Sequence, residues 1–146
     1  FRSPNYDVGH EEIIKLLEKY SKKNKHFILR KTFGHRMYLS MLKNVDFIIG
    51  NSSSGILEAP IFKTASINIG NRQKGRTRTS SILDCNSKHK EISKSIDTVY
   101  QVNFLTKLKK TKLQYSYKDS ADIMIKKLKK IIKEPKVEKI FQFRNL

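Results

Sequence analysis

The residues most able to do chemistry are three consecutive serines, Ser52–Ser54, in the stretch FIIGNSSSGILEAP. An apolar strand candidate precedes them and a helix candidate follows. Free backbone N–H groups at a helix start, together with serine hydroxyls, can bind an anion, and Gly55 would allow its close approach. Alternatively, Ser53 or Ser54 simply caps the helix, since serine is a favoured N-cap residue. On these residues alone capping is favoured, and the two interpretations are compatible.

A nucleophilic serine is a third interpretation of the same loop. Such a serine needs a base held by a carboxylate. His35 is available, because it is expected at the mouth of a neighbouring strand. However, the segment lacks the G-x-S-x-G pattern that exposes a nucleophile at a strand-to-helix turn. We therefore rank this interpretation last.

Two charged residues near the serines raise the question of their partners. Glu58 is expected about one turn into the helix among apolar residues, where a carboxylate needs a partner. The hydroxyls of a ribose would satisfy it, as would an ion pair with Arg72 or a lysine. Arg72 belongs to the basic loop NRQKGR, which is either a phosphate clamp or a solvated segment. Asn5 alone is only a turn residue.

Alternating strand and helix signals place these loops. We predict helices over 9–23, 36–43, 54–62, 88–100 and 119–133, and strands over 26–30, 46–50, 65–70 and 81–85. The stretch 102–118 is the least regular. Short apolar strands between helices predict an α/β fold, a Rossmann-like three-layer α/β/α sandwich with a mainly parallel sheet. Ligands in such folds bind beyond the carboxyl ends of the strands, where the candidate loops should gather.

The length of 146 residues suits one domain, predicted over 1–135, with a tail over 136–146. The hydrophobic fraction of 38% is typical of globular proteins, and no apolar run is long enough to span a bilayer. The single cysteine, Cys85, excludes an internal disulfide and fits a reducing cytoplasm. Because the chain begins with Phe1 and not Met, we expect it to be a piece of a longer protein.

The formal net charge of +18 would attract phosphates of nucleic acid, lipid or nucleotide. Many lysines fall between Lys107 and Lys139, interleaved with Leu and Ile at helical spacing. This pattern is typical of the solvated face of amphipathic helices, which is the interpretation that we favour. A basic nucleic-acid-binding module is an alternative, although no recognition-helix motif or aromatic stacking platform is visible.

Several motifs occurring in order resemble one enzyme family. GNSSSGILEAP, SINIGNRQKGR and SILDC, with PNYDVG at the start and EPKVEKIFQF at the end, are similar to the carboxyl-terminal half of the hydrolysing UDP-N-acetylglucosamine 2-epimerases. The resemblance covers about Phe1 to Phe143. Ala65 departs from it, because relatives usually have proline there. The resemblance implies the second domain of a glycosyltransferase-B-type fold, with UDP held between two Rossmann-like domains.

The same resemblance assigns roles to individual residues. It implies that Ser52 and Ser53 contact the diphosphate beside Gly55, Glu58 contacts the ribose hydroxyls and Arg72 binds phosphate. It further implies that Asn5 lines the nucleotide site, the Phe33 backbone meets uracil and Tyr38 flanks that base. No functional histidine of the family corresponds to His35, which is therefore expected to be structural.

The implied reaction is anti-elimination of UDP from UDP-N-acetylglucosamine, followed by hydration at C2 to give N-acetylmannosamine for sialic-acid or related synthesis. The resemblance implies no metal and no nicotinamide or other cofactor. The catalytic carboxylates would belong to the first domain, so we expect no catalytic residue here and no activity of this chain alone. Expected partners are UDP or its sugar and the first domain, in a cytoplasmic homo-oligomer without nucleic acid or membrane. The sugar is N-acetylglucosamine or its 4-acetamido-6-deoxy analogue, and another glycosyltransferase-B-type donor domain is the closest alternative.

Overall fold

The computed structural model describes residues 9–113 and 119–133 of the chain. They belong to two compact units, 1–114 and 115–146. The first unit contains α1 (His10–Lys23), α2 (His35–Asn44), β1 (Phe47–Gly50), α3 (Ser54–Leu57), the 3-10 helix η1 (Ala59–Phe62), β2 (Ala65–Ile69), β3 (Ile82–Cys85), α4 (His89–Val99) and α5 (Val102–Lys109). The second unit contains α6 (Ser120–Lys133). The domain boundary predicted at residue 135 lies outside the described residues and stays a prediction.

The first unit is built on a three-stranded parallel sheet in the order β1-β2-β3. Phe47 pairs with Ala65 at the start of β1, and Gly50 pairs with Asn68 at its end. On the other side of β2, Ser66 pairs with Ile82. All three strands therefore end at the same edge, where the serine loop and the basic loop leave the sheet.

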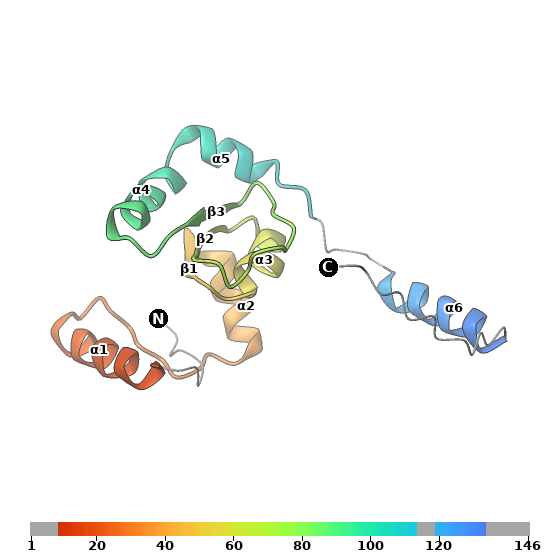
Figure 1. Ribbon diagram of the computed structural model, residues 1–146, viewed down its shortest axis with the longest axis horizontal. Helices are drawn as coiled ribbons and strands as arrows, with labels where there is room; N and C mark the ends of the chain where they lie inside the picture. The colour runs from red at the N-terminus through yellow and green to blue at the C-terminus, as the bar shows by residue number, and fades with distance from the viewer. Residues whose placement is uncertain (1–8, 114–118, 134–146) are drawn as a thin grey trace, which may run out of the picture. The chain divides into compact units, whose positions relative to one another are not determined.

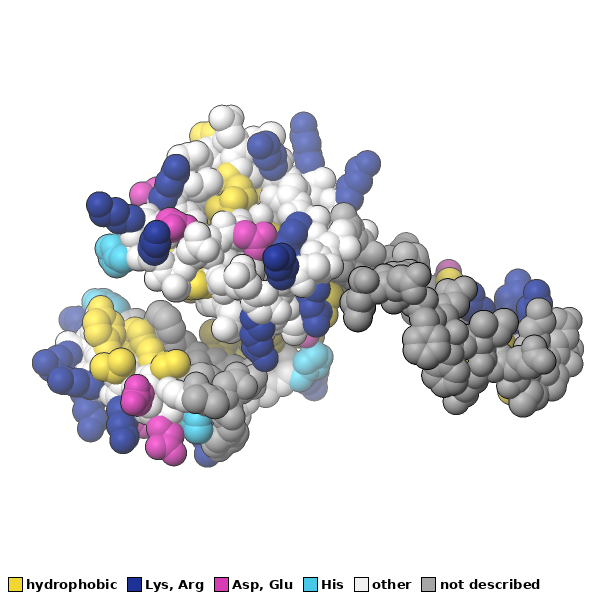
Figure 2. Space-filling model, viewed as in Figure 1, with side chains coloured by type: hydrophobic (Ala, Val, Ile, Leu, Met, Phe, Trp, Pro, Cys, Tyr) yellow, Lys and Arg dark blue, Asp and Glu magenta, His cyan; other side chains and the backbone are white. Residues whose placement is uncertain are grey.

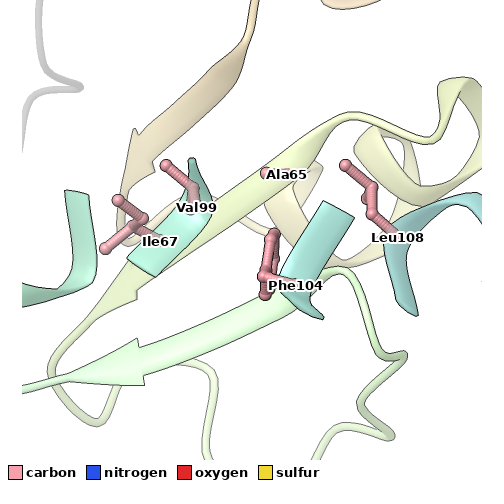
Figure 3. Packing of buried hydrophobic residues seen from close by; sticks show 5 residues of the cluster. All are labelled: Ala65, Ile67, Val99, Phe104 and Leu108. Atoms are coloured by element: carbon pink, nitrogen blue, oxygen red, sulfur yellow. The ribbon is translucent and has the colours of Figure 1, made fainter. Parts of the chain in front are cut away.

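Helices α4 and α5 cover one face of the sheet (Figure 1). The core on this face consists of apolar side chains that are less than a tenth exposed: Ala65, Ile67, Val99, Phe104 and Leu108 (Figure 3). Phe104 and Leu108 are four residues apart on α5, so both reach the same surface. Burial of this helical stripe is what attaches α5 to the sheet.

The opposite face of the sheet is covered by α3, which packs on β1 and β2. A Cβ atom at Gly55 would lie 2.4 Å from Ser66 Oγ, so any larger residue would force the Ser66 side chain or α3 to shift. Four consecutive residues of β2 are buried although their side chains alternate between the two faces of the sheet: Ala65, Ser66, Ile67 and Asn68. This is expected for a central parallel strand with both faces covered. The predicted α/β sandwich is thus confirmed.

Predictions for individual elements were correct for most helices and for the strands of the sheet, with three errors. The predicted helix 54–62 is two helices, because Pro60 has no N–H to donate to the carbonyl of Ile56. Residues 27–29 have no regular secondary structure, and Arg30 forms only an isolated bridge. The stretch called irregular contains α5.

Helices α1 and α6 resemble one another in composition, since each carries an apolar stripe between charged residues. No residue of α1 is buried. On α6 the apolar side chains are also exposed, Ile132 by 75%. Within residues 9–113 and 119–133, we find no helix with the length and hydropathy of a membrane span.

Candidate functional site

A cavity of about 360 Å³ lies at the carboxyl end of β1. The segment before α2 and the first turn of α2 form one wall, and the serine loop with α3 forms the other. The lining residues are Thr32, Phe33, Gly34, His35, Tyr38, Ser52, Ser53, Ser54, Leu57 and Glu58. The fold therefore brings together five predicted ligand residues: Phe33, Tyr38, Ser52, Ser53 and Glu58.

The three serines use their hydroxyl groups differently. Ser53 occupies the N-cap position of α3 but makes no capping bond through its side chain. Instead Ser52 Oγ accepts a hydrogen bond of 3.3 Å from the backbone N–H of Ser54. The Ser53 hydroxyl has no hydrogen-bond partner among the described residues. The interpretation that Ser53 or Ser54 caps the helix through its side chain is therefore wrong.

Ser54 belongs to a chain of polar groups in the cavity wall. Its hydroxyl donates to Glu58 Oε2 at 2.5 Å. It also shares a hydrogen bond with the Tyr38 hydroxyl. Neither Arg72 nor a lysine forms an ion pair with Glu58 among the described residues, so that alternative for the Glu58 partner is not realised. Glu58 and Tyr38 are both half-buried.

His35 lies in the wall of the same cavity, at the first residue of α2. The expected position at a strand mouth was compatible with a functional role, but His35 was predicted to be structural because no functional histidine of the family corresponds to it. No hydrogen bond joins His35 to any of the serines within residues 9–113. The cavity therefore lacks the serine–histidine pair that a nucleophilic serine requires.

The basic loop is hydrogen-bonded to the serine loop but does not line the cavity. Gln73 is buried, and its Nε2 donates to the Asn51 carbonyl at 2.8 Å. Arg72, next to it, is exposed and lies outside the cavity wall. The two loops thus meet as predicted, and Arg72 is the residue next to Gln73, which makes the hydrogen bond between them.

Arg78 holds the basic loop in place and was not singled out from the sequence. Its Nη1 donates to the carbonyls of Gln73 and Arg76, each at 2.9 Å. Its Nε forms an ion pair with Asp84 on β3, also at 2.9 Å. The hydrogen bonds from Arg78 lower the pKa of Asp84, desolvation opposes the shift, and a bond from Asn68 adds to it. These partners lie within six residues of Arg78, but no recognised sequence motif marks the contacts.

Two other predicted site residues are not found in the cavity wall described here. Gly55 does not line the cavity, and its close contact is with Ser66 of β2. Asn5 lies outside the described residues. Among the residues that the structure describes, no group of three or more His, Cys, Asp or Glu side chains could hold a metal ion.

The cations of the first unit do not form a single track on the face seen in Figure 2. Lys and Arg side chains are spread over several elements there, with acidic side chains between them. A continuous basic stripe is the electrostatic footprint expected of a nucleic-acid-binding module. The visible face therefore gives no support to that alternative.

Comparison with known proteins gives consistent matches. A family model described as UDP-N-acetylglucosamine 2-epimerase matches residues 1–129. A GDP/UDP-N,N'-diacetylbacillosamine 2-epimerase (hydrolyzing) of Campylobacter jejuni is 48% identical over 85 residues, which is 58% of this chain and 22% of the relative. The polysialic acid biosynthesis protein P7 of Escherichia coli is 36% identical over 121 residues, 83% of this chain and 30% of the relative.

A third relative carries the family's own name. The UDP-N-acetylglucosamine 2-epimerase of Neisseria meningitidis is 38% identical over 93 residues, 64% of this chain and 24% of the relative. The chain thus spans less than a third of the length of each of these relatives. The family model covers most of the chain, and the matched residues include every residue that lines the cavity. The chain belongs to the UDP-N-acetylglucosamine 2-epimerase family.

Proposed function

We propose that this chain is the UDP-binding carboxyl-terminal domain of a hydrolysing UDP-N-acetylglucosamine 2-epimerase. The complete enzyme would eliminate UDP from UDP-N-acetylglucosamine and add water at C2 to give N-acetylmannosamine. In this proposal the present chain holds the leaving group. The groups that move protons belong to another domain of a glycosyltransferase-B-type enzyme.

The observation that carries the proposal is the combination of donors and acceptors in one cavity. Ser52 uses its oxygen to accept the Ser54 N–H, so its own hydroxyl proton can still be donated to a ligand. The Ser53 hydroxyl is likewise available. A few residues away, Glu58 offers a carboxylate oxygen, which only accepts. A ligand with an anion close to hydroxyl groups, such as a nucleoside diphosphate, fits this arrangement.

Fixed donors also suit the chemistry of the proposed step. When UDP leaves, negative charge develops on its diphosphate, and prearranged donors stabilise that charge without reorganising. Arg72 would add a full positive charge from the basic loop, which Gln73 links to Asn51. The proposal therefore assigns Arg72 to the outer side of the diphosphate.

Titration calorimetry on the 146-residue chain tests the proposal. We expect UDP to bind, and Ser52→Ala, Ser53→Ala and Arg72→Ala each to weaken binding about ten- to a hundredfold, the effect of losing roughly one hydrogen bond to a charged group. Ser95→Ala is the matched control, because this hydroxyl bonds to the Glu91 carbonyl on α4 and lies outside the cavity wall. No heat with millimolar UDP would contradict the proposal.

Catalysis provides a second test. We expect no turnover of UDP-N-acetylglucosamine by this chain alone, because the proton-transfer groups are assigned to another domain. Measurable release of UDP by the purified chain, lost in Ser52→Ala, would show that this assignment is wrong. Binding to nucleic acid that falls steeply with salt and survives the serine substitutions would favour the basic-module alternative.

The sugar has a second candidate. The Campylobacter jejuni relative is named for N,N'-diacetylbacillosamine, which corresponds to the 4-acetamido-6-deoxy alternative, and it is 48% identical over its 85 matched residues. Assay of the complete enzyme with both UDP-sugars distinguishes the candidates. A higher kcat/KM with the diacetamido sugar would assign the chain to the bacillosamine branch.

A further inference from the structure

The direction of the hydrogen bonds in the cavity wall follows from counting protons. A serine hydroxyl has one proton to donate and two lone pairs that accept. Ser54 donates its proton to Glu58 Oε2, because a carboxylate can only accept. Ser54 therefore has no proton left for any other partner.

The bond between Tyr38 and Ser54 then has only one possible direction. Since the Ser54 proton is engaged, the Tyr38 hydroxyl donates and Ser54 Oγ accepts. The chain runs from Tyr38 through Ser54 to Glu58, with every proton directed toward the carboxylate. Both ends of the chain line the cavity.

This direction determines what the wall can offer a ligand. The Tyr38 proton is used, so its oxygen can only accept, and Glu58 retains a second carboxylate oxygen that also accepts. Ser52 and Ser53 keep protons to donate, and so does Thr32 before α2, whose Oγ1 accepts from the Gly34 N–H. The hydrogen-bonded chain therefore forms an accepting side of the cavity, Tyr38 and Glu58, whereas Ser52 and Ser53 form a donating side on the serine loop.

We propose that Ser54 is a positioning residue that fixes Glu58 and Tyr38 as paired acceptors for the hydroxyl-bearing part of the ligand, and that it does not bind the anion. This inference rests on the proposed function, because it names the part of UDP that Ser54 serves. Holding a glutamate side chain in one conformation costs conformational entropy, because the side chain loses its free rotation. The hydrogen bond from Ser54 already orders Glu58 in the unbound chain, so ligand binding loses less of this entropy.

Binding of two ligands by the 146-residue chain separates the two sides of the cavity. UDP carries both an anion and hydroxyl groups, whereas inorganic pyrophosphate has no ribose. In Ser54→Ala we expect UDP affinity to fall about five- to tenfold, with pyrophosphate affinity changed less than about twofold. In Ser52→Ala we expect both affinities to fall.

Two further variants distinguish positioning from a general structural role. Ser54→Thr keeps the hydroxyl and should restore UDP affinity to within about twofold of the unaltered chain. In a Glu58→Gln background, adding Ser54→Ala should cost little more, because residues that act through one interaction are not additive. If the extra methyl group of threonine disturbs α3, the Ser54→Ala, Glu58→Gln double variant still tests whether Ser54 acts through Glu58.

Each outcome has one meaning. The positioning role is overturned if Ser54→Ala leaves UDP affinity unchanged or lowers the affinities for UDP and pyrophosphate equally. In either case, UDP binding by the unaltered chain still supports the proposed function. Full additivity of Ser54→Ala and Glu58→Gln also overturns it. If the unaltered chain binds neither UDP nor pyrophosphate, the proposed function fails, and this inference fails with it.

Discussion

Replacing Arg78 by alanine tests whether the basic loop is held by its contacts to β3. The guanidinium of Arg78 joins Asp84 on β3 to the carbonyls of Gln73 and Arg76 in the loop. Alanine removes all of these bonds and creates no new contact. We expect Arg78→Ala to lower the free energy of unfolding by about 1–2 kcal/mol at pH 7.

The magnitude follows from the exposure of the groups. The Arg78 side chain is 27% exposed and that of Asp84 is 51% exposed, so solvent screens their ion pair. Pairs of this kind contribute about 0.2–1 kcal/mol. The two bonds to carbonyl oxygens add roughly 0.5 kcal/mol each once competition with water is counted. The sum stays well below the 3–5 kcal/mol lost on breaking a fully buried pair.

The effect should depend on pH in a defined direction. The hydrogen bonds from Arg78 lower the pKa of Asp84 in the folded chain, whereas an unfolded aspartate titrates near pH 3.9. The stabilisation is therefore complete above about pH 5 and is lost as pH falls below roughly 4, through the folded pKa. Below that window the carboxyl group is protonated and the charge–charge part of the interaction disappears.

Urea unfolding at pH 7 and pH 3 measures this prediction, with the unaltered chain, Arg78→Ala, Asp84→Asn and the double variant. We expect a coupling energy of about 0.5–1 kcal/mol at pH 7 that is smaller at pH 3, because the lowered pKa of Asp84 lies below its unfolded value. Arg36→Ala is the matched control, since Arg36 is exposed on α2 and makes no ion pair among the described residues. A coupling energy that is zero at pH 7, or equal at both pH values, would refute the reasoning.

Two packing predictions concern the two faces of the sheet. Gly55→Ala should destabilise the fold by about 1 kcal/mol, because its Cβ would lie 2.4 Å from Ser66 Oγ, and adding Ser66→Ala should recover most of the loss in thermal unfolding. Phe104→Ala should cost about 3–5 kcal/mol in urea unfolding, whereas Val102→Ala on the same helix, at a side chain 77% exposed, should change stability by less than about 0.5 kcal/mol. An equal effect of both α5 substitutions, or no rescue by Ser66→Ala, would contradict the packing described here.

Much of the fold could be predicted because its determinants are periodic. The stripes of α1, α4 and α6 recur at helical spacing, and the apolar strands of the sheet are short and bounded by polar loops. The helix α5 was missed because its lysines obscured a stripe that only two buried residues, Phe104 and Leu108, define. Residues 26–30 show the reverse error, since an apolar run indicates burial but becomes a strand only when a partner strand pairs with it.

The candidate site was predictable where it follows from topology. Parallel strands end at one edge, so the serine loop and the basic loop had to meet there. The bond from Gln73 to Asn51, by contrast, depends on how a buried amide is oriented after folding. The place of His35 in the cavity wall depends on how α2 packs. Neither has a signature in the local sequence.

The contacts of Arg78 imply that fold stability and ligand affinity are linked in this chain. Asp84 holds Arg78, Arg78 holds the Gln73 carbonyl, and the Gln73 side chain holds Asn51, the residue before the serines. The first link joins β3 to the basic loop, the second lies within that loop, and the third joins it to the serine loop, so β3 supports both loops. The serine loop therefore keeps its donors in position partly because an ion pair forms on the third strand. A weaker affinity for UDP in a loop variant is consequently evidence about the site only after the fraction of folded chain has been measured.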